Sequence, residues 1–161
     1  MEIREATPDD APTVNDELLV PGFRETTAVD PGFLELDEDG VADAGLGRWL
    51  DDEDRVVFVA ERETEDGDAE LVGHISAGKH DSPPIYARGP YANVDGLYVK
   101  PAHRREGVAA GLFDRVEAWA RDRGCERVAV SAHVDNDAAV EMYDERFERT
   151  FVSYRGRLDG E

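Results

Sequence analysis

Alternation of apolar and polar residues marks several short stretches of the chain, and this period of two is typical of β-strands. Stretches 55–62 and 71–80 are rich in β-branched residues, and the turn-forming sequence at 67–70 between them predicts a hairpin. The same pattern predicts four further strands, at 2–7, 91–100, 127–134 and 149–158.

Helical spacing of apolar residues is clearest between positions 106 and 123. The residues that repeat there on one helical face are Val108, Leu112, Phe113, Val116, Trp119 and Ala120. Gly124 follows them, and glycine is the residue most often found just past a helix C-terminus. The stretch therefore predicts a long amphipathic helix.

Three shorter stretches also predict helices. Thr7, followed by a proline and two acids, is a start signal for a helix over 7–19. Asn136 is a suitable N-cap for a helix over 135–147. A third helix over 40–52 is weakened by its glycines.

Two segments predict loops. Residues 20–40 contain two Pro-Gly pairs, and residues 81–90 are rich in proline. The resulting order is βααβββαβαβ, which predicts an α/β fold of the α+β kind, with one mixed sheet and helices on both faces. The length suits a single domain over 1–161.

The charge of the chain bears on the protein surface and its partners, and it does not alter the predicted fold. Its 38 acidic and 18 basic residues give a formal net charge of −20, and the acids are dispersed along the sequence. Such a surface is typical of a protein from a salt-loving organism, because about 1 M salt shortens the Debye length to roughly 3 Å. An acidic docking surface for a basic partner is the alternative. Nucleic-acid binding is not expected, because it requires a basic stripe.

We expect a cytoplasmic protein without disulfides, metal or membrane contact. Cys125 is the one cysteine, and the four histidines are scattered. The N-terminal residues lack the apolar core of a signal peptide, and no apolar run approaches the roughly 18 residues of a membrane span.

The stretch 94–112 has the features of an anion site. A strand, a short loop and a helix start follow one another, and the first N–H groups of a helix point outward without partners. Gly107 permits close approach to the backbone, and Arg104 and Arg105 add positive charge. Neither GxxxxGK[ST] nor GxGxxG is present. Alternatively, the arginines pair with surface acids and the glycine only starts a helix.

Two motifs, one in this stretch and one later in the chain, are similar to those of the GNAT acetyltransferase superfamily. An apolar triplet precedes [RQ]xxGx[GA], here residues 104–109, and Asn136, Ala139 and Tyr143 match NxxAxxxY. The strand and helix order also fits, so the resemblance covers nearly the whole chain.

The resemblance implies acetyl-CoA as the co-substrate. Its pyrophosphate would lie on the loop and helix start formed by Arg104, Arg105, Glu106, Gly107, Val108, Ala109 and Ala110. The pantetheine arm would run along Leu97, Tyr98 and Val99, with Asn136 on its other side.

The resemblance also implies catalytic roles. Tyr143 would protonate the departing thiolate of CoA. Alternatively, Tyr143 has no catalytic role and is a core residue of an amphipathic helix. Asp95 is the candidate base for the acceptor amine, with a water relay, and His133 is an alternative. We expect His74 and His80 to be ordinary strand residues, and Cys125 not to be a nucleophile.

Two departures from the family pattern bear on the acceptor. Ser131 stands where relatives that acetylate protein N-termini often carry a glutamate, and no glycine precedes Phe147. The leading hypothesis is an N-acetyltransferase acting on a primary amine of a small molecule or peptide. A non-catalytic acyl-CoA sensor, a protein N-terminal or lysine acetyltransferase, and an acidic interaction module are the alternatives. The sequence does not determine the oligomeric state. Pairing of the predicted last strand, 149–158, between two chains would give a homodimer.

Overall fold

The computed structural model describes residues 1–33 and 35–158. The chain divides into two compact units, Met1–Ser131 and Ala132–Glu161, which we describe in turn. No helix within the described ranges is both long and apolar enough to cross a membrane.

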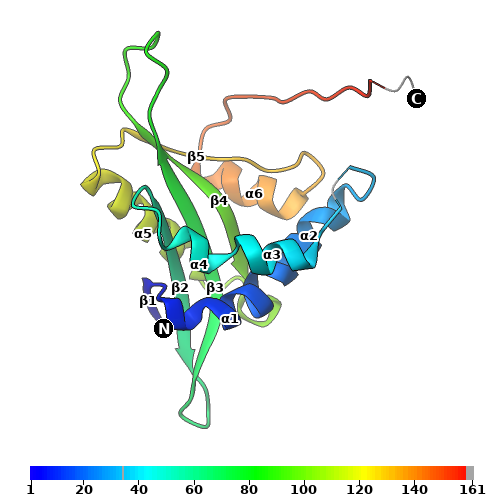
Figure 1. Ribbon diagram of the computed structural model, residues 1–161, viewed down its shortest axis with the longest axis vertical. Helices are drawn as coiled ribbons and strands as arrows, with labels where there is room; N and C mark the ends of the chain where they lie inside the picture. The colour runs from blue at the N-terminus through cyan, green and yellow to red at the C-terminus, as the bar shows by residue number, and fades with distance from the viewer. Residues whose placement is uncertain (34, 159–161) are drawn as a thin grey trace. The chain divides into compact units, whose positions relative to one another are not determined.

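The first unit is built on one five-stranded sheet (Figure 1). Its strands are β1 (Glu2–Glu5), β2 (Arg55–Glu63), β3 (Ala69–His80), β4 (Tyr91–Val99) and β5 (Arg127–Val130), and they neighbour one another in sequence order. The first four strands pair antiparallel, whereas β5 pairs parallel to β4. A parallel neighbour requires a crossover connection, and helix α5 (Val108–Asp122) supplies it. The predicted mixed sheet is confirmed.

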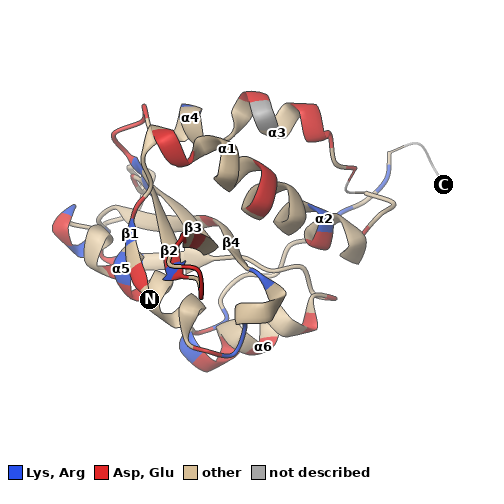
Figure 2. Cartoon of the chain, turned by 90° about the horizontal axis from the view of Figure 1, so that it is seen from below, with Lys and Arg blue, Asp and Glu red and all other residues tan. Residues whose placement is uncertain are grey.

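Helix α5 covers one face of the sheet (Figures 1 and 2). Its predicted apolar residues are the ones it buries. A Cβ on Gly73 would lie 3.3 Å from Val108 Cγ1, and a Cβ on Gly111 would collide with Ile3, so both glycines let α5 lie close to the sheet. At the other end of α5, Gly124 has a φ of +76°, which confirms it as the terminating residue.

The other face is covered by a run of helical segments (Figure 2). These are η1 (Pro8–Asp10), α1 (Ala11–Thr13), η2 (Val14–Leu19), α2 (Val20–Val29), α3 (Glu38–Ala44) and α4 (Leu46–Trp49). The core cluster that they form with the sheet contains Ala6, Val14, Leu18, Leu19, Val41, Leu46, Val57, Val59, Leu71 and Tyr98. Helices on both faces are therefore confirmed.

The prediction of an irregular loop over 20–40 is wrong for residues 20–29, which form α2, and for residues 38–40, which begin α3. Pro21 cannot donate an N–H and would normally break a helix. Here the preceding segment η2 is a π-helix, in which the Val20 N–H bonds to the Asn15 carbonyl, five residues back. Gly22 packs on β4, because a Cβ there would lie 3.2 Å from Tyr98 Cβ.

The helix predicted over 40–52 is present as two pieces, α3 and α4, separated at Gly45. Asn15 explains the break, since its Oδ1 accepts a hydrogen bond from the Leu46 N–H at 3.2 Å. A Cβ on Gly45 would lie 2.3 Å from the same Oδ1. The glycine thus lets α4 start directly on η2.

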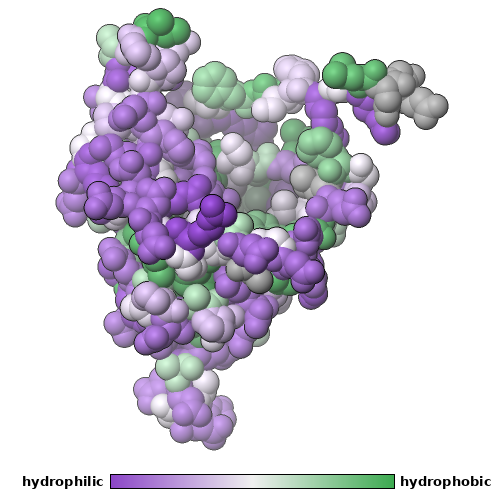
Figure 3. Space-filling model, in the orientation of Figure 1, coloured by the Kyte–Doolittle hydropathy of each residue, from purple (hydrophilic) through white to green (hydrophobic). Residues whose placement is uncertain are grey.

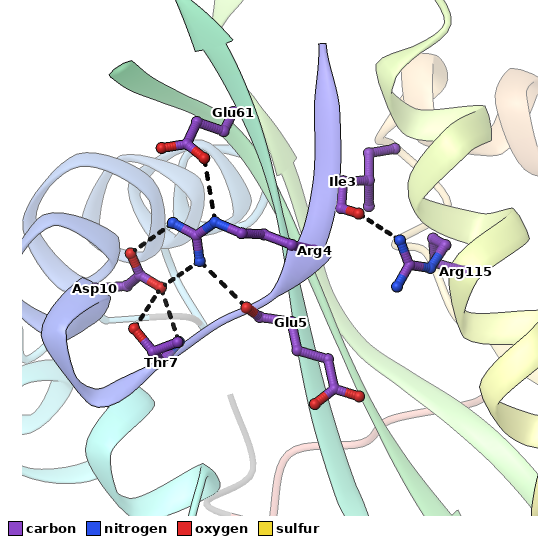
Figure 4. Close-up of polar contacts among 7 residues, drawn as sticks. All are labelled: Ile3, Arg4, Glu5, Thr7, Asp10, Glu61 and Arg115. Atoms are coloured by element: carbon purple, nitrogen blue, oxygen red, sulfur yellow. Dashed lines mark hydrogen bonds and ion pairs between the residues drawn. The ribbon is translucent and has the colours of Figure 1, made fainter. Parts of the chain in front are cut away.

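Arg4 fixes the start of the chain to this face (Figure 4). Its guanidinium donates to Asp10 at 2.8 and 3.0 Å and to Glu61 at 3.1 Å. Asp10 Oδ2 also accepts from the Thr7 N–H at 2.7 Å, in a capping box that confirms the predicted helix start. On the opposite side of β1, Arg115 donates to the Ile3 carbonyl.

Acidic residues are distributed over the helices of this unit (Figure 2). The face drawn in Figure 3 is mostly hydrophilic, with apolar atoms at the tip of the β3–β4 loop. Ile85 and Tyr86 of that loop are exposed.

The second unit contains helix α6 (Asp137–Arg146), with Asn136 as its N-cap. The strand predicted over 149–158 is wrong: this described segment belongs to no sheet, and Phe151 and Tyr154 are 91% and 92% exposed. Strand propensity acts only where a neighbouring strand offers hydrogen-bond partners. β5 ends at Val130, four residues earlier than predicted, although the neighbouring strand β4 continues to Val99.

Candidate active site

The β4–α5 loop has a backbone shaped for an anion. It passes through η3 (Pro101–His103), after which Arg105 and Gly107 both adopt left-handed conformations, with φ of +63° and +84°. Gly107 is the N-cap of α5 and offers no side-chain cap, so the N–H groups of residues 108–110 lack intrahelical acceptors. Nothing lies within 4 Å of a Cβ built on Gly107. Val108 is buried, whereas Ala110 is exposed.

Arg104 links this loop to α2. Its Nη2 donates to both carboxylate oxygens of Glu25, at 2.8 and 2.9 Å, and its Nε donates to the Val99 carbonyl at 2.8 Å. The guanidinium also lies 5.4 Å from the centre of the Tyr98 ring. Arg104 therefore pairs with a surface acid, which is the alternative to phosphate binding that the sequence left open. Sequence reasoning missed Glu25, because no local pattern connects two residues 79 positions apart.

Glu106 is also engaged in an ion pair. Its Oε2 lies 2.7 Å from Arg62 Nη1 at the end of β2. Arg62 therefore belongs to the surroundings of the loop.

A bulge interrupts β4 at Asp95. Ser76 pairs with Gly96 while Ala77 pairs with Val94, so Asp95 is the extra residue. The Asp95 side chain is exposed, and its Oδ1 accepts from Asn93 Nδ2 at 3.0 Å. Its Oδ2 lies 3.6 Å from a Cβ built on Gly78, which places the carboxylate on the sheet face opposite α5.

Beyond the bulge, one edge of β4 is open. The β4–β5 pairing covers only residues 91–94, so within the described chain no strand pairs with that edge of Leu97, Tyr98 and Val99. The N–H and C=O groups on such an edge can pair with an added extended chain. This edge runs directly into the β4–α5 loop.

Asn136 and Tyr143 lie together on the second unit, as the NxxAxxxY spacing predicts. Asn136 Oδ1 accepts from the Ala139 N–H at 3.2 Å. Burial raises the pKa of the Tyr143 phenol, whose ring meets Phe147 edge-on at 6.4 Å. A raised pKa keeps the phenol protonated at neutral pH, as a proton donor must be.

His133, the alternative base, already has a local partner. Its Nδ1 accepts from the Asp135 N–H at 3.1 Å. Cys125 follows the C-terminus of α5, and burial raises the pKa of its thiol, which opposes formation of a nucleophilic thiolate. In the described chain, no group of three His, Cys, Asp or Glu side chains is arranged to hold a metal ion.

The chain is similar to known proteins both in sequence and in fold. The acetyltransferase (GNAT) family matches residues 21–148. An aminoglycoside N(6')-acetyltransferase type 1 of Acinetobacter genomosp. 13 is 43% identical over 54 residues, 34% of this chain and 37% of the relative. The chain thus spans little more than a third of that relative's length in the match.

Solved structures extend the likeness to the whole fold. An acetyltransferase from Vibrio fischeri is 27% identical over 81% of this chain and 94% of its own, with a TM-score of 0.63. AAC(6')-Iy in complex with the bisubstrate analog CoA-S-monomethyl-acetylneamine is 23% identical, with a TM-score of 0.64 over 98% of both chains. The family match covers most of the sequence, and the observed mixed sheet follows the predicted order of strands and helices. The chain therefore belongs to the acetyltransferase (GNAT) family.

Proposed function

We propose that the protein is an acetyl-CoA-dependent N-acetyltransferase that acetylates a primary amine of a small molecule or peptide. One observation carries this proposal: the open edge of β4 leads directly into an uncapped helix N-terminus at Gly107. An extended arm that ends in phosphates requires both features in this order.

The residues present fit CoA. The backbone amides of residues 105–110 would receive the pyrophosphate, and the backbone of Leu97, Tyr98 and Val99 would pair with the pantetheine arm. Arg104 would add charge only after exchanging Glu25 for a phosphate, because its fork is already occupied. Asn136 would hold the arm from its second side.

The reaction would be a direct attack within a ternary complex. The amine nitrogen, after losing a proton, forms a bond to the acetyl carbon, and the C–S bond breaks. A main-chain N–H near Leu97–Val99 would stabilise the oxyanion. Asp95 would take the first proton, from the ammonium, and Tyr143 would give its proton to the CoA thiolate. The nitrogen loses its second proton after the attack, and that proton restores the Tyr143 phenol.

The acceptor we favour is a cationic amine. The chain carries 38 acidic and 18 basic residues, a formal net charge of −20. An acidic surface raises the local concentration of cations. Several relatives are named as aminoglycoside N(6')-acetyltransferases, so aminoglycosides are the first acceptors to test. Protein N-termini and lysine side chains are the alternative acceptors. Ser131 disfavours N-termini, because relatives that acetylate them often carry a glutamate at that position.

We further propose a cytoplasmic enzyme of a salt-loving organism that forms a homodimer. The exposed apolar side chains of Phe151, Val152 and Tyr154 favour contact with a second chain. Light scattering in 2 M KCl should give twice the mass of the 17.8 kDa chain, and a single-chain mass would reject the dimer.

The decisive experiment is an acceptor screen. Release of CoA thiol from acetyl-CoA is measured at 2 M KCl with aminoglycosides, polyamines and lysine peptides. Turnover with at least one amine is expected. Saturable acetyl-CoA binding by calorimetry without turnover would favour the non-catalytic sensor, and no binding would reject both.

The role of Tyr143 has its own test. General acids contribute about 10²–10⁴-fold to rate, so Tyr143→Phe should lower kcat about 100-fold and leave the affinity for acetyl-CoA unchanged. Unchanged turnover would remove Tyr143 from the mechanism.

A further inference from the structure

Two polar side chains of β3 are buried without partners. His74 and Ser76 are 3% and 4% exposed, and they are the only buried polar residues in the described part of the chain. Within that part, neither His74 Nδ1 nor Ser76 Oγ has a hydrogen-bond partner. Buried polar atoms in folded proteins almost always have one, if not from the protein then from an ordered water. The pair therefore indicates a small polar occupant.

The two side chains border the bulge of β4. His74 pairs with Tyr98 and Ser76 pairs with Gly96, the residue next to Asp95. A Cβ on Gly96 would lie 3.2 Å from Ser76 Oγ and 3.5 Å from His74 Cε1. Glycine at this position thus leaves the space above β4 open to both polar side chains.

Polar groups continue from this space to the surface. Residues paired across an antiparallel ladder share a face, so His74, Ser76 and Gly96 lie on the face opposite α5. Asp95 lies on the same face, over Gly78, and its carboxylate is exposed. The seam between β3 and β4 therefore has a buried polar end at His74 and a solvated end at Asp95.

The charges around the buried end are known. On this face β3 contributes His80, β4 contributes Tyr98 and Asp95, and β2 contributes Arg55 beside Gly78. The segment η2, packed over β3, buries only Val14, Leu18 and Leu19, while its acids Asp16 and Glu17 are exposed. Helices α2 and α4 carry Arg24, Glu25 and Arg48, none of them buried.

The chemistry of the pair suits a neutral occupant. Burial lowers the pKa of His74 to about 4, so the imidazole is neutral at physiological pH. A neutral imidazole has one donor and one acceptor nitrogen, and a serine hydroxyl can donate and accept. A water molecule can satisfy both groups at once, whereas an ion would find no counter-charge.

We propose that His74 and Ser76 hold one buried water molecule, which forms the inner end of a proton route from the acceptor amine to Asp95. The inference rests on the proposed acetyl transfer and makes both side chains positioning residues. An N–H bond of the ammonium breaks as its proton passes to the water, and the water releases a proton outward to the Asp95 carboxylate. The nitrogen keeps the electron pair that forms the bond to the acetyl carbon.

The water itself is tested without turnover. Water-selective Overhauser spectroscopy on ¹⁵N-labelled protein should show a long-lived water at the amides of Ser76 and Gly96. The signal should vanish in Gly96→Ala, which fills the space while keeping both polar groups. A wild-type protein without this signal would overturn the proposal, as would a signal that survives in Gly96→Ala.

The proton route is tested by pH profiles of kcat/KM with the best acceptor of the screen. Ser76→Ala should lose at least 10-fold at pH 7 and less than twofold above the pKa of the amine, where deprotonation is no longer needed. His74→Leu should behave alike. Ile75→Val, the neighbouring residue on the α5 face, is the control for core packing and should show the wild-type profile.

A loss that is equal at every pH, or no loss in Ser76→Ala, would overturn the route. If wild-type protein acetylates no amine, the proposed function fails, and the role of the pair in proton transfer fails with it. The Overhauser signal then still decides, separately, whether the water site exists.

Discussion

The two faces of the sheet are buried in different ways. Against α5, the strands present Phe58, Ile75, Ala77, Val94 and Val99, all of them apolar. Against the α1–α4 helices, the same strands present Val57, Val59 and Tyr98 together with the polar pair His74 and Ser76. A polar group buried without a partner costs about 1–3 kcal/mol, so this face depends on the proposed water to satisfy the pair, whereas the apolar face needs no such partner. The difference indicates that the α5 face serves stability and that the opposite face serves chemistry.

The largest effect should come from the α5 face. Leu112 is completely buried there, and Leu112→Ala should lower the free energy of unfolding by about 2–5 kcal/mol, through lost burial and a residual cavity. Urea denaturation at fixed high salt measures this. The exposed Arg121 of the same helix gives the control Arg121→Ala, which should change the value by no more than about 0.5 kcal/mol. A comparable loss in both variants would mean that α5 is not a packing element.

Two variants, one adding a hydroxyl on the α5 face and one removing a hydroxyl on the opposite face, measure how differently the two faces tolerate a polar group. Ala77 is 1% exposed and faces α5, so Ala77→Ser buries a hydroxyl among apolar groups and should cost about 1–3 kcal/mol. Ser76→Ala, one residue away on the other face, should change stability by less than about 1 kcal/mol. Chemical denaturation of both variants decides the matter, and equal costs would contradict a functional distinction between the faces.

Low pH should weaken the α1–α4 side. The hydrogen bond from Arg4 holds the pKa of Asp10 at about 2, below its ordinary 3.8, despite partial burial. Because the folded-state pKa is the lower one, the stabilisation is present above about pH 4 and is lost as the pH falls toward 2. After allowance for solvent screening, Asp10→Asn should cost about 1 kcal/mol at pH 7 and little at pH 2. A cost that does not change with pH would mean that the ion pair contributes nothing.

The smallest effect concerns the contact between α2 and the β4–α5 loop. Glu25→Gln releases the Arg104 fork, and an exposed ion pair is worth about 0.2–1 kcal/mol, so acetyl-CoA should bind about 1.4- to fivefold more tightly. Calorimetry measures the affinity. Glu38→Gln is the control. It removes the ion-pair partner of Arg24, which lies on α2 beside Glu25, and should leave the affinity for acetyl-CoA unchanged. Weaker binding in Glu25→Gln would show that the contact supports the loop.

Residue periodicity predicted most of the sheet and all of α5, because these elements depend on local alternation and helical spacing. It failed at α2, where the Pro21-Gly22 pair is accommodated by a π-turn and by close packing on Tyr98. It failed again at 149–158, where strand propensity meets no strand of the sheet.

The residues of the candidate site also divide into those that local sequence predicted and those that depend on contacts between distant segments. The loop motif and the Asn136 cap are local and were predicted. The bulge at Asp95 depends on the register between β3 and β4, and the Arg104–Glu25 pair joins distant segments. His74 and Ser76 did carry a signal, since polar residues two apart in a β-branched strand share a face, but the alternation alone does not say that the face is buried.

The most direct test of the account compares the two left-handed glycines at the ends of α5. Gly107 and Gly124 have φ of +84° and +76°, and neither would bring a Cβ within 4 Å of other atoms, so Gly→Ala imposes a similar strain at either end. Only Gly107 lies at the proposed pyrophosphate site. Calorimetry with acetyl-CoA in 2 M KCl should show binding to the wild type, at least 10-fold weaker binding to Gly107→Ala, and unchanged binding to Gly124→Ala. Equal affinities in both variants, or no binding to the wild type, would contradict the account.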